Sequence, residues 1–303
     1  MTTSSVPNPQ SRAYAYAALA CVCLLWGTTY LGIRISLEAL PPFYLIAIRY
    51  TISGGTLLLA AALCGASLPR RRELLRTAAC GVVCIGVGNG FLAVAELRVP
   101  TGLAALIYTT CPFWMAAVDA LLPGGKAPRA ASVWGLMVGS AGVLFLVLPG
   151  AVREGLGGGG VVGFLILQVS VAGWATGALL QKRVKTRASP LIVGAVQQLA
   201  AGLAMFVPAA IFEKAPSTLP LRPGLALAYL VVFGSLIGFS SFIYAMTRLP
   251  VALVSIYTFV NPVVAVFLGW LFFREPFGRR EFAAMLVIFA GVALVKRSES
   301  RST

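Results

Sequence analysis

The most constraining feature of this sequence is an internal repeat that relates its two halves at a nearly constant spacing. Trp26 and Trp174 lie 148 positions apart, and Gly54 and Gly202 are separated by the same distance. Four further pairs keep this spacing within two positions: Pro42 with Pro190, Pro100 with Pro250, Pro112 with Pro262, and Gly142 with Gly291. Such self-similarity at one period predicts two copies of a single structural unit.

The distribution of apolar residues predicts an all-α polytopic membrane protein. Hydrophobic residues make up 59% of the chain and charged residues only 11%, against roughly a half and a quarter in soluble domains. The apolar runs are about 20 residues long, which is the length that crosses a hydrocarbon core of roughly 30 Å. Ten transmembrane helices are predicted, at residues 14–34, 42–64, 74–95, 100–122, 130–149, 161–180, 190–212, 223–246, 250–273 and 281–295.

Five predicted helices in each half have a consequence for topology. An odd number of spans inserts the second copy upside down relative to the first, which is the inverted-repeat plan of secondary transporters. The sequence therefore predicts a first five-helix repeat over 14–149, a glycine-rich linker over 150–160 and a second five-helix repeat over 161–296. We expect a central cavity between the two inverted repeats.

The distribution of basic residues predicts the orientation in the membrane. With the N-terminus inside, fifteen Lys and Arg residues fall on the inner side and eight on the outer side. Basic loops are retained in the cytoplasm, so both termini are expected to be cytoplasmic, in the inner or plasma membrane. The same bias accounts for most of the formal net charge of +15. No nucleic-acid partner is expected, and the expected partners are the bilayer and a small-molecule substrate.

Residue types missing from the chain argue against catalysis and cofactors. The sequence contains no histidine, so histidine acid/base chemistry and a Cys/His metal site are excluded. The six cysteines lie in or at the ends of apolar segments, which favours packing over disulfides. The glycines between Gly81 and Gly90 include Gly-x-Gly spacing, but they lie inside a predicted span, where small residues allow close helix packing. Neither an enzyme, a metal nor a cofactor is predicted.

Ionisable residues inside the predicted spans are the strongest site candidates, because each is unfavourable in hydrocarbon unless it faces protein or water. Arg49 lies seven residues into its helix, about 10 Å from the outer end. Glu96 closes the third helix on the same side, so Arg49 could pair with Glu96 or bind an anionic part of the cargo. Asp119, the sole aspartate, is either functional or reaches the inner interface.

Aromatic and amide groups at similar depth complete the predicted substrate cavity. Repeat-related positions converge on the interface where transporters bind substrate, and Trp26 is related to Trp174 as Arg49 is to Gln197. The predicted lining residues are Trp26, Tyr30, Arg49, Asn89, Glu96, Tyr108, Trp174, Gln197, Tyr244, Tyr257 and Asn261. Pro112 and Pro262 lie within predicted helices and are expected to kink them beside the cavity.

Several motifs resemble EamA-type permeases of the drug/metabolite transporter superfamily. In the first half these are Leu25-Trp26-Gly27-Thr28-Thr29-Tyr30, Ile33-Arg34, Leu40-Pro41-Pro42, Ile48-Arg49-Tyr50, Gly88-Asn89-Gly90, Ala95-Glu96, the run from Val99 to Leu106, and Pro112-Phe113-Trp114. In the second half they are Asn261-Pro262 and Arg274-Glu275-Pro276. The resemblance extends from about Tyr14 to Val295 and is strongest to the drug/metabolite exporter branch.

This resemblance implies ten helices, cytoplasmic termini, a cavity between two repeats, and export of small metabolites by alternating access. The chain departs from a symmetric pattern after the ninth helix, where Glu275 has no counterpart in Pro123-Gly124-Gly125-Lys126 of the first half. An exporter of amino-acid-like or drug-like solutes is the favoured function, and coupling to protons is one option. A flippase, or an exchanger of nucleotide sugars or phosphorylated metabolites, is the alternative on the same scaffold.

Overall fold

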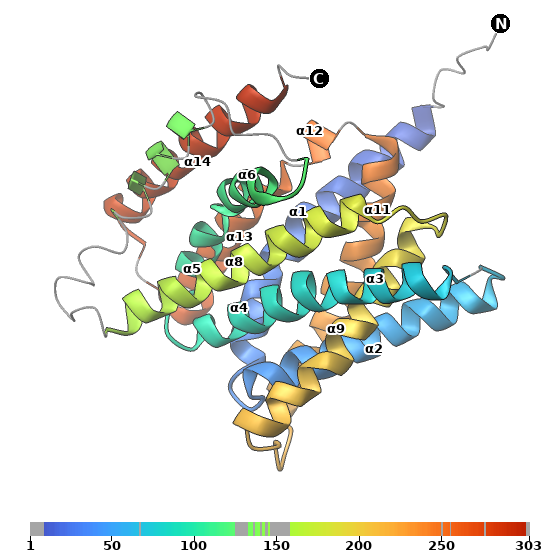
Figure 1. Cartoon of the computed structure of the whole chain (residues 1–303). Coiled ribbons are helices and arrows are strands. Elements are labelled where there is room, and N and C mark those ends of the chain that lie inside the picture. Colours follow the sequence, from blue (N-terminus) through green and yellow to red (C-terminus); the bar gives the residue numbers. More distant parts are fainter. Residues whose placement is uncertain are drawn as a thin grey trace, which may run out of the picture.

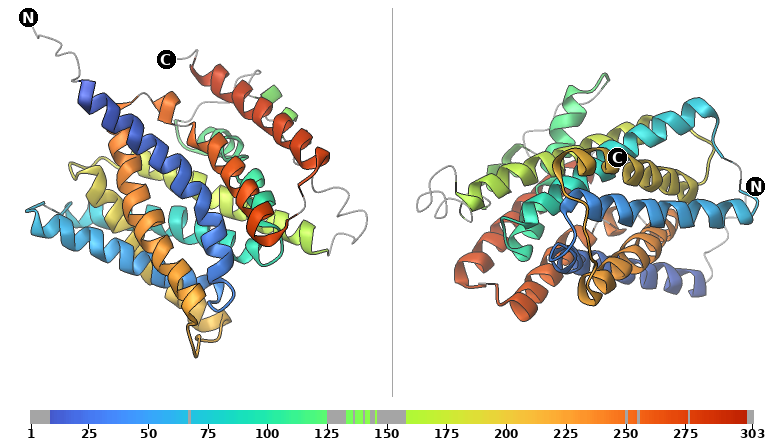
Figure 2. Two further views of the ribbon diagram at one scale, coloured as in Figure 1. Left: turned by 180° about the vertical axis from the view of Figure 1, so that it is seen from behind. Right: turned by 90° about the horizontal axis from the view of Figure 1, so that it is seen from below.

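The computed structural model describes residues 9–66, 68–124, 133–135, 137–139, 141–142, 145, 158–249, 251–254, 256–275 and 277–300. The described residues form helices, turns and short connections, without a strand. The helices cross one another in a single bundle, and both the start of α1 and the end of α14 lie toward the top of the view (Figure 1). Two further views show the long helices packed side by side around the bundle centre (Figure 2).

The helices of the first half precede residue 125. They are α1 (Pro9–Ser36), α2 (Pro42–Leu63), α3 (Arg71–Gly81), the π-helix η1 (Val82–Val87), α4 (Gly88–Glu96), α5 (Thr101–Tyr108) and α6 (Cys111–Leu121). The helices of the second half are α8 (Gly159–Arg183), α9 (Pro190–Phe212), α10 (Leu221–Tyr229), the π-helix η2 (Leu230–Ile237), α11 (Gly238–Arg248), α12 (Val251–Val254), α13 (Tyr257–Phe273) and α14 (Arg279–Ser300).

Seven helical stretches of the described chain are long and apolar enough to cross a membrane. They cover Ala13–Ser36, Pro42–Leu63, Arg71–Glu96, Thr101–Leu121, Gly159–Arg183, Pro190–Phe212 and Leu221–Arg248. The apolar helix α13 is shorter. These eight elements correspond to predicted helices one to four and six to nine, and α14 corresponds to the tenth. The predicted fifth helix, 130–149, and the linker, 150–160, lie largely outside the described residues.

Two predicted helices are interrupted in the structure. The segment predicted over 100–122 breaks between α5 and α6, so Pro112 lies in the first turn of α6 instead of mid-helix. A proline needs no amide donor at that position, which removes the expected cause of a kink there. The segment predicted over 250–273 divides into α12 and α13, and Pro262 lies inside α13.

The helices start and pack as their sequences lead one to expect. Pro42 and Pro190 begin α2 and α9, where the fixed φ angle of proline suits the first turn. These two helices make the most extensive contact of the described bundle. A Cβ atom on Gly54 would lie 2.2 Å from the Leu199 nitrogen, and one on Gly202 would lie 2.3 Å from the Thr51 nitrogen. Glycine is therefore required at both crossing points, because only it permits this backbone approach.

Apolar side chains also cover the outside of the bundle. Leu63, Leu121 and Phe212 are 80%, 86% and 76% exposed. Exposed large apolar side chains on this scale mark a membrane or protein contact surface. Together with the apolar helices, they place the bundle in lipid.

Candidate functional site

A cavity lies at the centre of the bundle, and helices from both halves line it. Its volume is about 150 Å³, similar to a cavity that holds one benzene ring. The residues lining it from the first half are Trp26, Thr29, Tyr30, Arg49, Tyr50, Ile85, Asn89, Leu92, Ala105, Tyr108, Thr109, Cys111 and Pro112. Those from the second half are Trp174, Gln198, Gly234, Ser235, Phe239, Tyr257, Thr258, Asn261 and Pro262.

Arg49 is the one charged residue among the described residues that line this cavity. Its side chain is buried within α2, and its Nε donates a 2.9 Å hydrogen bond to Ser235 Oγ of η2. The guanidinium carbon lies 4.7 Å from the centre of the Tyr50 ring, within the range of a cation–π interaction. The Nη1 atom is buried and has no hydrogen-bond partner. The protein therefore fixes the guanidinium through Nε, while the Nη1 donor remains unpaired.

Aromatic side chains form the walls of the cavity in two groups. Trp26 and Tyr257 meet edge to face, with 5.2 Å between ring centres. Trp174 and Tyr108 meet in a similar way at 6.4 Å, and Tyr108 also contacts Tyr30 at 6.5 Å. Edge-to-face pairs at these distances are favourable. The rings give the cavity rigid apolar walls with a hydroxyl or indole group at intervals.

The two π-helices lie beside the cavity. Ile85 of η1, Gly234 and Ser235 of η2, and Phe239 just after η2 line it. Short π segments inside α-helices occur frequently at functional sites. The Trp26 indole Nε1 donates a 3.0 Å hydrogen bond to the Gly234 carbonyl. A wall that combines a π-helix with a fixed indole is thus built around Arg49.

Most of the predicted cavity residues do line the cavity. Eight of the eleven are placed there: Trp26, Tyr30, Arg49, Asn89, Tyr108, Trp174, Tyr257 and Asn261. Both predicted kink prolines, Pro112 and Pro262, also line it. With its amide turned to satisfy both neighbours, Asn261 donates to the carbonyls of Cys23 and Tyr257 at 2.9 and 3.1 Å. Asn89 Nδ2 is buried without a hydrogen-bond partner.

Three predicted residues lie elsewhere. Gln197 donates to Gln181 Oε1 at 3.0 Å, and its neighbour Gln198 lines the cavity instead. Side chains of adjacent residues in a helix point about 100° apart. A repeat alignment that is uncertain by one residue therefore cannot tell whether Gln197 or Gln198 faces the cavity. Tyr244 packs under the Arg248 guanidinium, 5.2 Å from its carbon, away from the lining.

Glu96 is the third residue outside the lining, and among the described residues no hydrogen bond or ion pair of 4 Å or less joins it to Arg49. The Glu96 side chain is fully buried, and neither carboxyl oxygen has a hydrogen-bond partner. Arg34 Nη1 donates to the Glu96 backbone carbonyl instead of to its carboxyl group. Arg49 is directed toward Ser235 of the second half, because η2 brings a hydroxyl within reach of its Nε.

Sequence reasoning missed several polar lining residues. Ser235, Gln198 and Thr109 all line the cavity, and Gln198 accepts a 2.6 Å hydrogen bond from Ser53. Each is a small or neutral polar side chain within an apolar run. A search for every hydrogen-bonding side chain near mid-span would have found them, since such groups need a partner or water in a membrane.

Two carboxylates hold helix N-termini outside the cavity. Glu213, which follows α9, accepts hydrogen bonds from the backbone nitrogens of Phe43 (2.8 Å) and Tyr44 (3.0 Å) at the start of α2. Glu275, which follows α13, accepts from those of Thr101 (2.6 Å) and Gly102 (2.9 Å) at the start of α5. A carboxylate at a helix N-terminus satisfies open amides and the helix dipole. Each contact ties a second-half element to a first-half helix.

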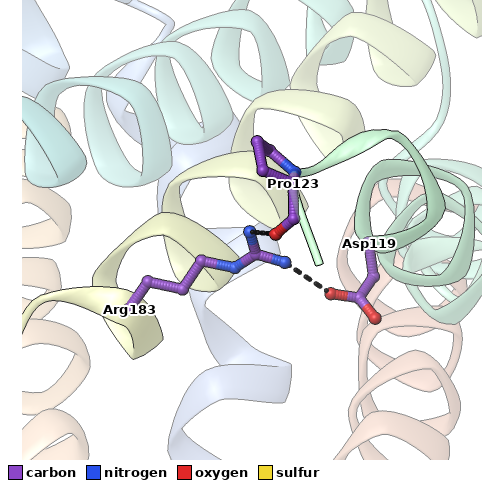
Figure 3. A network of polar contacts seen from close by, with 3 residues as sticks. All are labelled: Asp119, Pro123 and Arg183. Atoms are coloured by element: carbon purple, nitrogen blue, oxygen red, sulfur yellow. Dashed lines mark hydrogen bonds and ion pairs between the residues drawn. The ribbon is translucent and has the colours of Figure 1, made fainter. Parts of the chain in front are cut away.

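Asp119 forms an ion pair away from the cavity. Arg183 of α8 contacts Asp119 Oδ1 at 3.2 Å and donates to the Pro123 carbonyl at 2.8 Å (Figure 3). Both charged side chains are more than a third exposed, so the pair contributes modestly to stability. Asp119 therefore belongs to a contact between the ends of α6 and α8.

Several known proteins are similar to this chain over most of its length. The chain is 33% identical over 282 residues to the inner membrane transporter YedA of Escherichia coli K12, covering 92% of this chain and 90% of that protein. It is 26% identical over 291 residues to a probable terminal-alkyne amino-acid exporter of Streptantibioticus cattleyicolor, covering 92% of each. A protein crystal structure with 24% identity has a TM-score of 0.64 and covers 94% of this chain and 98% of that one.

The family comparison covers both halves. The profile of the EamA-like transporter family matches residues 13–148 and again residues 161–297. The match therefore extends over most of the chain, including the helices that line the cavity. This integral membrane protein belongs to the EamA-like transporter family.

Proposed function

We propose that this protein is a secondary transporter that exports small metabolites by alternating access. A cavity at the centre of the bundle, lined by both halves and containing the buried cation Arg49, supports this proposal most strongly. Transporter binding sites lie near the membrane midplane, between structural repeats. An aromatic cavity of about 150 Å³ suits a small solute better than a nucleotide sugar or a lipid headgroup.

Reciprocal contacts support the proposal that the halves, 14–149 and 161–296, are inverted five-helix repeats. Gly54 of α2 approaches Leu199, while Gly202 of α9 approaches Thr51. Leu199 is 148 positions after Thr51, and Gly202 is 148 positions after Gly54. The two helices therefore exchange roles across one contact, as a two-fold axis between them requires.

The cavity walls repeat the same relationship. Trp26 contacts Tyr257, and its repeat counterpart Trp174 contacts Tyr108. The two π-helices, η1 and η2, also begin 148 positions apart, at Val82 and Leu230. With the predicted helix 130–149 added to the nine described elements, these contacts favour ten spans around a pseudo-two-fold axis. In this arrangement, rocking one half against the other would expose the cavity to each side in turn.

The orientation in the membrane gives a first test. We predict that the loop after α8 is cytoplasmic, because residues 182–187 carry four basic side chains. On a background in which the six native cysteines are replaced, Ser189→Cys, exposed at the start of α9, should react with an impermeant thiol reagent in inverted vesicles but not in intact cells. Ser217→Cys, in the exposed loop after α9, is the matched control and should show the reverse. Labelling of Ser189→Cys from outside would contradict this orientation.

Export itself is tested by flux. Inverted vesicles from cells that produce the protein should accumulate at least one labelled small metabolite faster than vesicles without it, and a proton gradient imposed on the vesicles tests coupling. A panel of neutral, anionic and zwitterionic solutes of the size of the cavity is the appropriate set. Equal rates for every solute in the two vesicle preparations would count against the transport function.

A further inference from the structure

We propose that the cavity is a binding site for a small carboxylic acid with an apolar body, whose carboxylate is held by Arg49 and Asn89. This inference rests on the proposed function and narrows its cargo from small metabolites to a chemical class. Three features of the described residues carry it: an incompletely satisfied buried cation, a second open donor in the same cavity, and apolar walls.

The first feature is the state of Arg49. Its side chain is 4% exposed, and only Nε has a hydrogen bond, to Ser235. Nη1 is buried without a partner. A buried arginine with an unpaired donor is unfavourable, and a bound anion that accepts its hydrogen bonds offsets that cost. The guanidinium also has the planar fork that matches a carboxylate.

Among the described lining residues, no carboxylate pairs with Arg49. The two ion pairs there, Asp119–Arg183 and Glu38–Arg222, involve partly exposed side chains. None of the residues that line the cavity is acidic. Glu96 is buried but lies outside the lining, and its oxygens bond to no donor. The cavity therefore has a formal charge of +1 that a monovalent anion would balance.

The second feature is Asn89. Its side chain lines the same cavity from α4, and its Nδ2 is buried without a partner. Buried amide donors are nearly always satisfied, so an open amide donor and an open arginine donor lining one cavity indicate that a ligand supplies the acceptors. A carboxylate has two oxygens and can accept from both groups at once.

The third feature is the largely apolar character of the other walls, which favours a monovalent anion over a phosphate or a zwitterion. The remaining walls are largely aromatic and apolar, with Trp26, Tyr108, Trp174 and Tyr257 among them, and they favour an apolar body of about one ring. A doubly charged phosphate would carry two negative charges, and Arg49 could balance only one of them. The ammonium group of a zwitterion would find no carboxylate among the lining residues.

Binding of sodium benzoate, compared with neutral benzamide and cationic benzylamine, tests the inference on the purified full-length protein. Trp26 and Trp174 line the cavity, so tryptophan fluorescence reports occupancy. Benzoate should bind at least about tenfold more tightly than benzamide, because hydrogen bonds between charged groups are worth roughly 1.5–3 kcal/mol. Benzylamine should not bind. Equal affinities for benzoate and benzamide would overturn the proposal.

Variants of Arg49 and Asn89 test whether each side chain contributes to the preference for benzoate over benzamide. Arg49→Gln should lose at least about tenfold in benzoate affinity while benzamide changes by less than about threefold. Asn89→Leu keeps the charge and should weaken benzoate by about fivefold, the loss expected for one hydrogen bond. Arg222→Gln is the matched control, since that arginine is 65% exposed in its ion pair with Glu38, and it should bind benzoate like the parent protein.

If Arg49→Gln does not fold, Arg49→Lys and Asn89→Leu still decide the matter: both should weaken benzoate selectively, and unchanged affinity in both would contradict the site. Benzoate binding without flux of any carboxylate in vesicles would support the site and contradict the transport function. Flux of neutral and anionic solutes at equal rates would support transport and overturn the carboxylate site.

Discussion

Replacing Gly54 with alanine is expected to destabilise the protein by at least about 3 kcal/mol, the upper range for overpacking in a close-packed interior. The added Cβ atom would lie 2.2 Å from the Leu199 nitrogen. Backbone atoms cannot swing away as a side-chain tip can, so α2 and α9 would have to separate. The apparent melting temperature in detergent, followed by size-exclusion chromatography after heating, measures the effect.

The adjacent residue provides a matched control. A Cβ atom on Gly55 would meet no atom within 4 Å, so Gly55→Ala should leave stability unchanged or raise it by up to about 1 kcal/mol through helix propensity. Gly202→Ala should behave like Gly54→Ala, since its Cβ atom would lie 2.3 Å from the Thr51 nitrogen. Equal melting temperatures for Gly54→Ala and Gly55→Ala would show that α2 and α9 are not in the close contact described.

Loss of the Glu275 carboxylate has the second largest expected effect. Glu275→Ala removes both acceptors for the Thr101 and Gly102 amides at the start of α5. Because Glu275 is only half-buried and water can replace part of the interaction, the expected destabilisation is about 2 kcal/mol. Thermal unfolding of the purified variant measures it.

Two further variants distinguish the loss of this helix-end contact from a general effect of removing a negative charge. Glu213→Ala should cause a loss of similar size, because Glu213 accepts from two amides of α2 in the same way. Glu38→Ala removes a carboxylate from a partly exposed ion pair with Arg222 and should change stability by less than about 1 kcal/mol. If all three variants unfold at the same temperature, Glu213 and Glu275 do not hold the halves together.

Much of the bundle follows from the sequence alone, because a membrane leaves helices as the main way to satisfy a backbone in lipid. Apolar runs and prolines located eight of the predicted helices closely. The sequence did not reveal the break before Pro112 or the division of α12 from α13, because both lie inside continuous apolar runs. Nor could it show that Glu275 stabilises α5, a helix 174 positions away in the chain.

The candidate site was partly predictable for a different reason. Arg49, Asn89 and the aromatic residues are recognisable because polar and ionisable groups at membrane depth are rare. The choice between Gln197 and Gln198 depends on helix rotation, which a repeat alignment does not resolve. The hydrogen-bond partner of Arg49 depends on where η2 places Ser235, and depth in the membrane does not reveal that position.

Alternating access requires that the cavity open to each side of the membrane in turn, and Cys111 can report this opening because it lines the cavity. A variant that retains Cys111 and has the other five cysteines replaced by alanine would be treated with an impermeant thiol reagent in right-side-out and in inverted vesicles. Alternating access predicts labelling of Cys111 in both preparations, with sodium benzoate slowing the reaction in each. Labelling from one side alone, whatever the gradient or solute present, would contradict it.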